Sequence, residues 1–385
     1  MIYLDNCATT KMRKEVLNKM YTALAEDFGN PSSLHRLGLK TEKKVEGARE
    51  IIGDFLQVEK EEIYFTSGGT ESNNLALQSI INGFKRRGKH IITSKIEHPS
   101  ILNVVKNYEK LGFSVSYLNV DKNGQIKLDE FRKALRQDTI LVSIIHVNNE
   151  IGTIQDIAAI KRIMKEERSQ ALLHVDGIQS FGKIDFSLRE LEVDSFSFSG
   201  HKIYGPKGVG GLYINKNLKL DPITYGGNQE KGLRSGTENV PAIIALGEAV
   251  RILKERQKKE AQHVKEIRGY MIEKLKENVK DVRINTPLDE KSSPYVLSLS
   301  FINTRGEVLL HYLEDREIYV STTSACSSKG TEKSHVLQAI GLSDREIEGT
   351  IRICFSHETK KEDIDYTVEV LKEIVAEIRQ IMGGD

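Results

Sequence analysis

The sequence contains few cysteines, no tryptophan and no long apolar run. Its three cysteines, Cys7, Cys326 and Cys354, are widely separated and odd in number. They therefore predict neither a disulfide framework nor a spaced set of metal ligands, and a reducing cytoplasm fits them best. No apolar run approaches the roughly 18 residues that a membrane-spanning helix needs, so we expect the chain not to enter a membrane.

An excess of charge of either sign is also absent. The 56 basic residues against 55 acidic residues leave a formal charge of +1, so no overall field favours nucleic acid or an anionic membrane as a partner. Hydrophobic residues make up 39% and charged residues 29% of the 385 positions, a balance that is typical of globular proteins. This length predicts one large domain and one smaller domain.

Short β-rich runs alternate with helical patterns from about residue 60 to residue 215. Such alternation is typical of a mostly parallel sheet covered by helices. A long helical stretch follows, from Pro241 to about Asn278, and its proline stands in the first turn, where the missing amide proton does little harm. Shorter strand and helix patterns come after it and predict a smaller α+β unit.

The first candidate site is TSGGTESNN, residues 66–74. A strand-like run ends here in two glycines, and a helix begins with Thr70 and Glu71. Glycine lets the backbone approach a ligand closely, and the free amides of a helix N-terminus point at an anion, so phosphate is the expected ligand. Taken alone, the pattern also fits an ordinary turn and N-cap. It is not a Walker loop, because no lysine follows the glycines.

Two further candidates follow later strand-like runs. Asp176, in HVDGIQS, stands at the carboxyl end of such a run, where it could hold a cation; a helix N-cap is the alternative. Lys202, in SGHKIYGPKG, follows a strand and two small residues, and a partly desolvated lysine can form imines with carbonyl compounds. A lone lysine is usually a solvated surface charge. The order of phosphate loop, Asp176 and Lys202 along the chain favours a shared site instead.

Nine segments together resemble the cysteine desulfurases, class V pyridoxal phosphate enzymes of fold type I, over nearly the whole chain. In family order they are YLDNCATT, GNPSSLH, TSGGTESNN, EHPS, VNNEIG, HVDGIQS, SGHKIYGPKG, RSGTEN and SACSS. The resemblance implies an α/β fold with a large domain over residues 15–255 that carries a mostly parallel seven-stranded sheet. It also implies a smaller α+β domain over residues 1–14 and 256–385 that carries the cysteine loop.

The resemblance assigns roles to individual residues. Lys202 would carry pyridoxal phosphate as a Schiff base, Asp176 would pair with the pyridine nitrogen, and Gln179 would hydrogen-bond the ring hydroxyl. His98, in EHPS, would stack on the pyridine face and relay protons. The phosphate would be held by Gly69, Thr70, Ser199 and His201, and by Thr237 from the neighbouring subunit of a homodimer. Relatives often have alanine where this chain has Gly69.

The substrate implied by the resemblance is L-cysteine. Asn149 would contact cofactor and substrate, and Arg352 would clamp the substrate carboxylate in a bidentate manner. Cys326, in a stretch of small and polar residues, would attack the substrate sulfur as a thiolate. The products would be L-alanine and a persulfide on Cys326. Its sulfur would pass to an acceptor protein, for iron-sulfur cluster assembly or for thiolation of tRNA or a cofactor, and no metal is expected at the site.

Other functions remain open on the sequence alone. A selenocysteine lyase or an aminotransferase would use the same cofactor and fold, but an aminotransferase has no need of the thiol of Cys326. A noncatalytic cofactor-binding adaptor is the alternative of another class, and the presence of both Lys202 and Cys326 argues against it. A Rossmann dehydrogenase fits poorly, because no G-x-G-x-x-G segment opens a helix.

Overall fold

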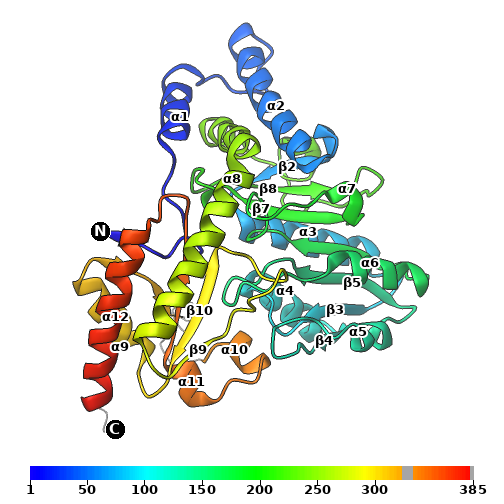
Figure 1. Ribbon diagram of the computed structural model, residues 1–385. Coiled ribbons are helices and arrows are strands. Elements are labelled where there is room, and N and C mark those ends of the chain that lie inside the picture. The colour runs from blue at the N-terminus through cyan, green and yellow to red at the C-terminus, as the bar shows by residue number, and fades with distance from the viewer. Residues whose placement is uncertain (323–332, 382–385) are drawn as a thin grey trace.

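The computed structural model describes residues 1–322 and 333–381. Its main sheet consists of β2 (Ile63–Thr66), β3 (His90–Ser94), β4 (Ser114–Leu118), β5 (Thr139–Ile145), β6 (Leu172–Asp176), β7 (Ser195–Ser199) and β8 (Gly210–Ile214). The strand order is β2-β8-β7-β6-β5-β3-β4, in which β8 is antiparallel to both neighbours and the other adjacent pairs are parallel. This sheet, on the right in Figure 1, confirms the predicted mostly parallel seven-stranded sheet.

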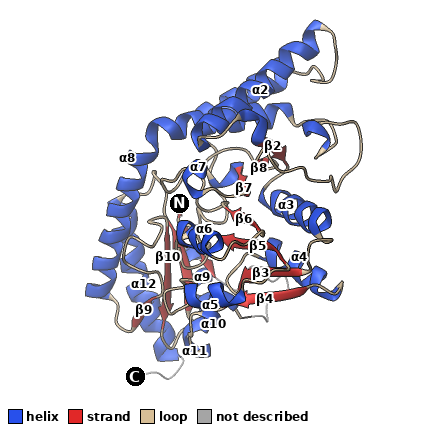
Figure 2. Cartoon of the chain, turned by 90° about the vertical axis from the view of Figure 1, so that its right-hand side faces the viewer, coloured by secondary structure: helices blue, strands red, loops and turns tan. Residues whose placement is uncertain are grey.

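Helices cover both faces of the main sheet, as Figure 2 shows. One face packs against α3 (Gly69–Phe84) and α4 (Pro99–Lys110). The other packs against α2 (Arg36–Leu56), α5 (Leu128–Ala134), α6 (Ile157–Glu166), α7 (Leu188–Leu191) and the first part of α8 (Val240–Asn278). Because both faces are covered, β3, β5, β6, β7 and β8 are buried along their whole length. This burial accounts for the nearly continuous apolar run of β5, whereas the small serines of β7 alternate with Phe196 and Phe198.

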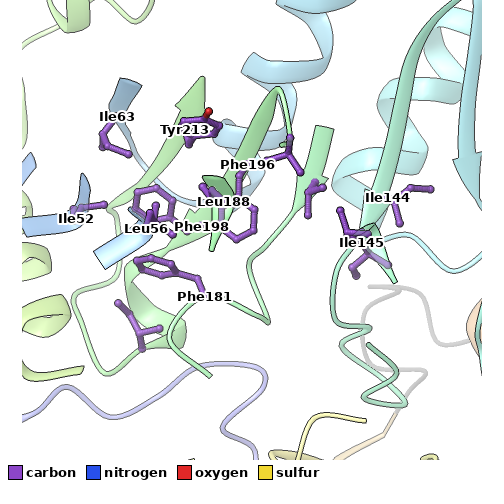
Figure 3. Packing of buried hydrophobic residues seen from close by; sticks show 14 of the residues in the cluster. Ile52, Leu56, Ile63, Ile144, Ile145, Phe181, Leu188, Phe196, Phe198 and Tyr213 are labelled. Carbon is purple, nitrogen blue, oxygen red and sulfur yellow. The ribbon is translucent and has the colours of Figure 1, made fainter. Parts of the chain in front are cut away.

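Aromatic side chains form the centre of the core on the second face (Figure 3). The ring centroid of Phe181 lies 4.6 Å from that of Phe198, and Phe55 meets Phe181 edge-on at 5.4 Å. Ile52 and Leu56 of α2 belong to the same buried cluster. These contacts hold β7 against the segment that follows β6. They therefore fix the position of the carboxyl end of β6 relative to that of β7.

Helix α8 joins the two parts of the chain. Its N-cap Asn239 accepts a hydrogen bond from the backbone N–H of Ala242, and Pro241 stands in its first turn, as expected. Its first half packs with α1 (Lys14–Glu26) and α2 on the main core, whereas its second half, with Val264 and Leu275, belongs to a second core. In Figure 1 the helix therefore runs from the upper part of the molecule to the lower left.

The second core surrounds a smaller antiparallel sheet with the order β12-β13-β10-β9. Its strands are β9 (Val282–Ile284), β10 (Val296–Phe301), β12 (Ser321–Thr322) and β13 (Thr350–Cys354), and its other helices are α9 (Gly306–Asp315) and α12 (Lys361–Ile381). Beside it, β1 (Ile2–Tyr3) pairs in parallel with β11 (Ile318–Tyr319). The N-terminal segment thus packs with the C-terminal part of the chain, and Leu4 belongs to the second core.

Two short helices from the C-terminal part of the chain pack against the main core. They are α10 (His335–Ala339) and α11 (Asp344–Glu348), and their residues Val336, Leu337 and Ile347 pack in the main core. They fall within residues 256–385, the range assigned to the small domain. The domain boundaries therefore stay a prediction. Three single-turn helices complete the described elements: η1 (Lys60–Glu62), η2 (Gly200–Lys202) and η3 (Glu230–Gly232).

Across residues 1–322 and 333–381, no helix combines the length and the apolar composition that crossing a bilayer requires. Even α8, with 39 residues, carries charged side chains such as Arg251, Lys254 and Glu255 between its apolar ones.

Candidate active site

A cavity of about 490 Å³ opens at the carboxyl ends of the central strands. Its wall includes the last residues of β5, β6 and β7, which are Ile145, Asp176 and Ser199. Arg352 of β13 and Asp5 close it from the side of the smaller sheet. Ligands of open α/β sheets bind at this edge, and the volume suits a small molecule.

Ten of the predicted site residues line this cavity. They are Gly69, Thr70, His98, Asn149, Asp176, Gln179, Ser199, His201, Lys202 and Arg352. Thr237 is exposed in the loop before α8 and does not line it. Cys326 lies outside the described residues, so its place relative to the cavity stays a prediction. Within the described residues, no three His, Cys, Asp or Glu side chains are grouped to hold a metal ion.

Lys202 ends the short helix η2 directly after β7. Its Nζ donates to two backbone oxygens of the N-terminal segment, those of Cys7 at 2.5 Å and Ala8 at 2.8 Å. Burial, together with the nearby ammonium of Lys183, lowers the pKa of Lys202 to about 8. A larger share of its amine than of an ordinary lysine is therefore uncharged near neutral pH, and the uncharged form is the one that attacks carbonyl groups.

The rate at which the cofactor-free protein combines with pyridoxal phosphate is expected to rise with pH and to level off above about 8. Only the neutral amine reacts, and an ordinary lysine reaches that form near 10.5. Stopped-flow absorbance at a series of pH values measures this rate, with acetyl-lysine amide as the reference amine. A protein rate that keeps rising as steeply as that of the reference would contradict the prediction.

Asp176 is 2% exposed and is held from two sides. Its Oδ1 accepts from the backbone N–H of Ile178 at 3.0 Å, and its Oδ2 accepts from Asn73 Nδ2 at 2.9 Å. Burial raises the pKa of Asp176, and a cation in the cavity would oppose this effect. The carboxylate is thus oriented to receive a positively charged partner from the cavity.

His98 is the N-cap residue of α4. Its Nδ1 accepts from the backbone N–H of Ser100 at 3.1 Å and lies 2.8 Å from Ser100 Oγ. Burial lowers the pKa of His98, so the ring is neutral near pH 7. Since Nδ1 accepts, the proton of the neutral ring is on Nε2.

Gln179 is fixed at both ends of its amide. Its Oε1 accepts from Lys183 Nζ at 2.8 Å, and its Nε2 donates to the backbone oxygen of Cys7 at 2.9 Å. One N–H of the amide remains for a ligand in the cavity. Lys183 is buried, with 5% of its surface exposed, and sequence analysis did not identify it as part of the site. Its spacing of four residues from Gln179 was the one feature of the sequence that could have indicated this contact.

The predicted phosphate end of the cavity has free hydrogen-bonding groups. Among the described residues, no side chain caps the start of α3 after Gly68, and the buried Oγ of Ser199 has no hydrogen-bond partner. A Cβ at Gly69 would lie 2.2 Å from Ile178 Cδ1. Alanine, which relatives often have here, would therefore force the Ile178 side chain to move, and glycine fits without that change.

Arg352 lies in the middle of β13 and is only 7% exposed. Its guanidinium donates to the backbone oxygen of Asn149 at 2.9 Å, to Asp5 Oδ1 at 3.0 Å and to Ser321 Oγ at 3.1 Å. Its buried Nε has no hydrogen-bond partner in residues 1–322 and 333–381. The side chain is therefore held in place with donor capacity to spare for an anionic ligand.

Cys7 and Cys354 are both buried free thiols. Together with Val296 they form a small buried cluster, and Cys7 also reaches the cavity wall. Cys354 is completely buried at the end of β13.

Glu97, the residue before His98, is a buried carboxyl group that sequence analysis missed. It is 0% exposed, and its Oε1 accepts from Ser94 Oγ at 2.5 Å and from the backbone N–H of Ile145 at 3.0 Å. Its Oε2 has no hydrogen-bond partner within the part of the chain that the structure describes. Burial, reinforced by the charge of Asp176, raises the pKa of Glu97 to about 8, so the group is mostly uncharged at neutral pH.

The variant Glu97→Gln is expected to gain stability relative to the wild type as pH rises from 4.5 to about 8, and to gain no more above that. The folded-state pKa of Glu97 lies above the unfolded value, so the wild type loses stability as the unfolded chain releases this proton first. Glutamine has the same shape and does not titrate. Thermal melts across this range measure the difference, and Glu42→Gln on the surface serves as the control. A difference that does not change with pH would contradict the assignment of a neutral Glu97.

Comparison with known proteins extends this picture to the family. Residues 2–367 match the family model described as aminotransferase class-V. A protein named cysteine desulfurase IscS from Dictyoglomus turgidum is 45% identical over 380 residues, which cover 99% of this chain and 96% of the relative. One from Escherichia coli is 43% identical over 385 residues, covering 99% and 94%.

Solved structures agree. A NifS-like protein superposes with a TM-score of 0.92 at 42% identity, covering 97% of this chain and 99% of its own. A structure described as SspA in complex with cysteine has a TM-score of 0.82 at 35% identity, covering 94% and 100%. The fold is that of a fold type I enzyme that depends on pyridoxal phosphate. The chain belongs to the cysteine desulfurases of the class V aminotransferase family.

Proposed function

We propose that this protein is a cysteine desulfurase, which transfers the sulfur of L-cysteine to Cys326 and releases L-alanine. The observation that carries this proposal is the meeting of Lys202, Asp176 and Arg352 in one cavity. An amine with a lowered pKa, a buried carboxylate and a buried guanidinium there provide for a carbonyl cofactor, its ring nitrogen and a substrate carboxylate.

The cavity residues fit pyridoxal phosphate. Its phosphate is suited by Ser199 Oγ and by the start of α3, which have neither partner nor side-chain cap in the described part of the chain, and the remaining N–H of Gln179 suits its ring hydroxyl. When bound, this cofactor withdraws electrons from the α-carbon of an amino acid, provided that its ring nitrogen stays protonated. Asp176 supplies the negative charge that keeps that proton in place.

The chain's own residues then have separate tasks. Arg352 and Asn149 orient the substrate, because the guanidinium is already fixed by the backbone oxygen of Asn149 and by Asp5. Lys202, once its amine is free, accepts the α-proton of the substrate. His98 presents its Nε2 proton, since Nδ1 is occupied by Ser100.

Sulfur transfer falls to Cys326. Its thiolate attacks the sulfur of the substrate, an S–S bond forms, and the bond between that sulfur and the β-carbon breaks. The β-carbon takes up a proton, so cysteine and one thiol give alanine and one persulfide with all atoms and electrons accounted for. The persulfide sulfur then passes to an acceptor protein, for iron-sulfur cluster assembly or for thiolation of tRNA or a cofactor.

The working form that we propose is a homodimer in the cytoplasm. Large apolar side chains are exposed near the first two helices: Tyr21, Phe28 and Leu34 are 73%, 75% and 93% exposed. Such an apolar surface is typical of a protein interface. Thr237, which lies away from its own cavity, would complete the phosphate site of the partner subunit. The three widely separated cysteines support a reducing compartment.

Product analysis tests the proposal. The purified protein, with pyridoxal phosphate and a reductant, is given L-cysteine, L-selenocysteine or L-alanine with a keto acid, and alanine, sulfide and new amino acids are measured. Alanine and sulfide in equal amounts from L-cysteine support a desulfurase. Alanine from selenocysteine alone would identify a lyase for that substrate, amino transfer would identify an aminotransferase, and bound cofactor without turnover would support an adaptor.

A further inference from the structure

Asn73 of α3 lies directly behind the cavity wall and is completely buried. It does not line the cavity itself, but it hydrogen-bonds Asp176 and is linked through Ser100 to His98, and these two residues do line it. Its Nδ2 donates to Asp176 Oδ2 at 2.9 Å and to Ser100 Oγ at 2.9 Å. A carboxylate can only accept hydrogen bonds, so the amide must present its NH₂ group to Asp176.

The other end of the Asn73 amide fixes this orientation. Its Oδ1 lies 3.2 Å from Nε2 of His174, which is itself completely buried. Burial lowers the pKa of His174 to about 3, so the ring is neutral and carries one proton. That proton is on Nε2, because an amide oxygen only accepts. Nδ1 then accepts from Ser195 Oγ at 2.8 Å, and the chain of donors runs from Ser195 through His174 and Asn73 to Asp176.

A second branch leads from Asn73 to His98. Because Ser100 Oγ accepts from Asn73, its own proton points to His98 Nδ1 at 2.8 Å. The backbone N–H of Ser100 donates to the same nitrogen at 3.1 Å. Two donors on Nδ1 leave the proton of the neutral ring on Nε2.

We propose that Asn73 is a positioning residue that sets two groups of the cofactor site at once: it keeps Asp176 ionised and aimed at the ring nitrogen, and it fixes the tautomer of His98. Both effects come from the two N–H bonds of one side chain, which makes the amide hard to replace. This inference rests on the proposed roles of Asp176 and His98 at pyridoxal phosphate. It extends them to a residue that touches neither cofactor nor substrate.

Nitrogen-15 NMR tests this role without relying on turnover. The protein is loaded with pyridoxal phosphate labelled at the ring nitrogen, and its histidines are labelled as well. In Asn73→Ala the shared proton is expected to move from the ring nitrogen toward Asp176, with the equilibrium between the two sites shifted about tenfold by the loss of one hydrogen bond to a charged group. The His98 resonances are expected to show a larger share of the Nδ1–H tautomer.

The adjacent Asn74 provides a matched control. It lies on the same helix turn, and its Nδ2 donates to the backbone oxygen of Thr70 at 3.0 Å. Asn74→Ala is therefore expected to give wild-type resonances for both the ring nitrogen and His98. If Asn73→Ala does not fold, as judged by circular dichroism, Asn73→Ser is measured in its place.

The possible results distinguish a failure of the role of Asn73 from a failure of the role of Asp176. A ring nitrogen that is protonated in the wild type and equally protonated in the folded Asn73 variant, with His98 unchanged, would overturn the role of Asn73 alone. A wild-type ring nitrogen that carries no proton would overturn the proposed role of Asp176, and the inference would fall with it. If the resonances of the ring nitrogen and of His98 both change in Asn73→Ala, the result supports the proposal that Asn73 acts on both groups.

Discussion

In Cys326→Ala, formation of L-alanine from L-cysteine is expected to fall by at least about a thousandfold, the order of loss that follows removal of a catalytic nucleophile. The cofactor site should be intact, because the groups assigned to the cofactor, such as Asp176, Gln179 and Lys202, line the cavity from segments far from residue 326 in the sequence. Without a thiol there is no acceptor for the substrate sulfur. Alanine release, persulfide by mass spectrometry and the absorbance of bound cofactor are measured side by side.

The other two cysteines supply the control for this experiment. Cys354 is completely buried in β13, and its thiol contacts the Cys7 cluster rather than solvent. Cys354→Ser keeps the shape of the side chain and is expected to retain alanine formation within a few fold and to carry the persulfide on Cys326. Equal activity in Cys326→Ala and wild type, or a persulfide on Cys7 or Cys354, would refute the assignment of the nucleophile.

Most of the fold could be predicted, because its signals are local. The alternation of strand and helix patterns from residue 60 to residue 215 predicts the sheet from β2 to β8, and the structure confirms it. The helix expected from Pro241 to Asn278 begins one residue earlier, at Val240, since Asn239 caps it. Helices α1 and α2, before residue 60, were not predicted, although they pack against α8 and complete the main core.

The motifs locate the site, but they do not reveal the hydrogen bonds behind it. Asn73, Lys183 and Glu97 are ordinary polar residues in the sequence, and only the folded chain shows that each is buried against a residue that lines the cavity. The contact of Gly69 with Ile178 is of the same kind. A sequence gives residue types and spacing, whereas burial and partner choice depend on segments that meet only in the folded chain.

Lys202 is the residue whose removal should affect both binding and chemistry. In wild-type protein treated with borohydride and then unfolded, the cofactor is expected to remain attached to the peptide that contains Lys202. In Lys202→Ala no such attachment should form, and alanine release should fall by at least about a thousandfold, because the amine that binds the cofactor and accepts the α-proton is gone. Peptide mass spectrometry and alanine assays measure the two effects separately.

The structure makes this prediction specific to one lysine. Lys202 faces the cavity, and burial lowers its pKa to about 8, whereas Lys216 is exposed and paired with Glu59. Lys216→Ala should therefore keep both the attachment and the activity. Lys183 is the stronger alternative as carrier of the cofactor, because it is also buried and lies near the cavity. Its Nζ, however, donates to Gln179 Oε1 at 2.8 Å. A reduced cofactor found on Lys183 in the wild type would reassign the carrier, and Gln179 would then lose the contact that fixes its amide.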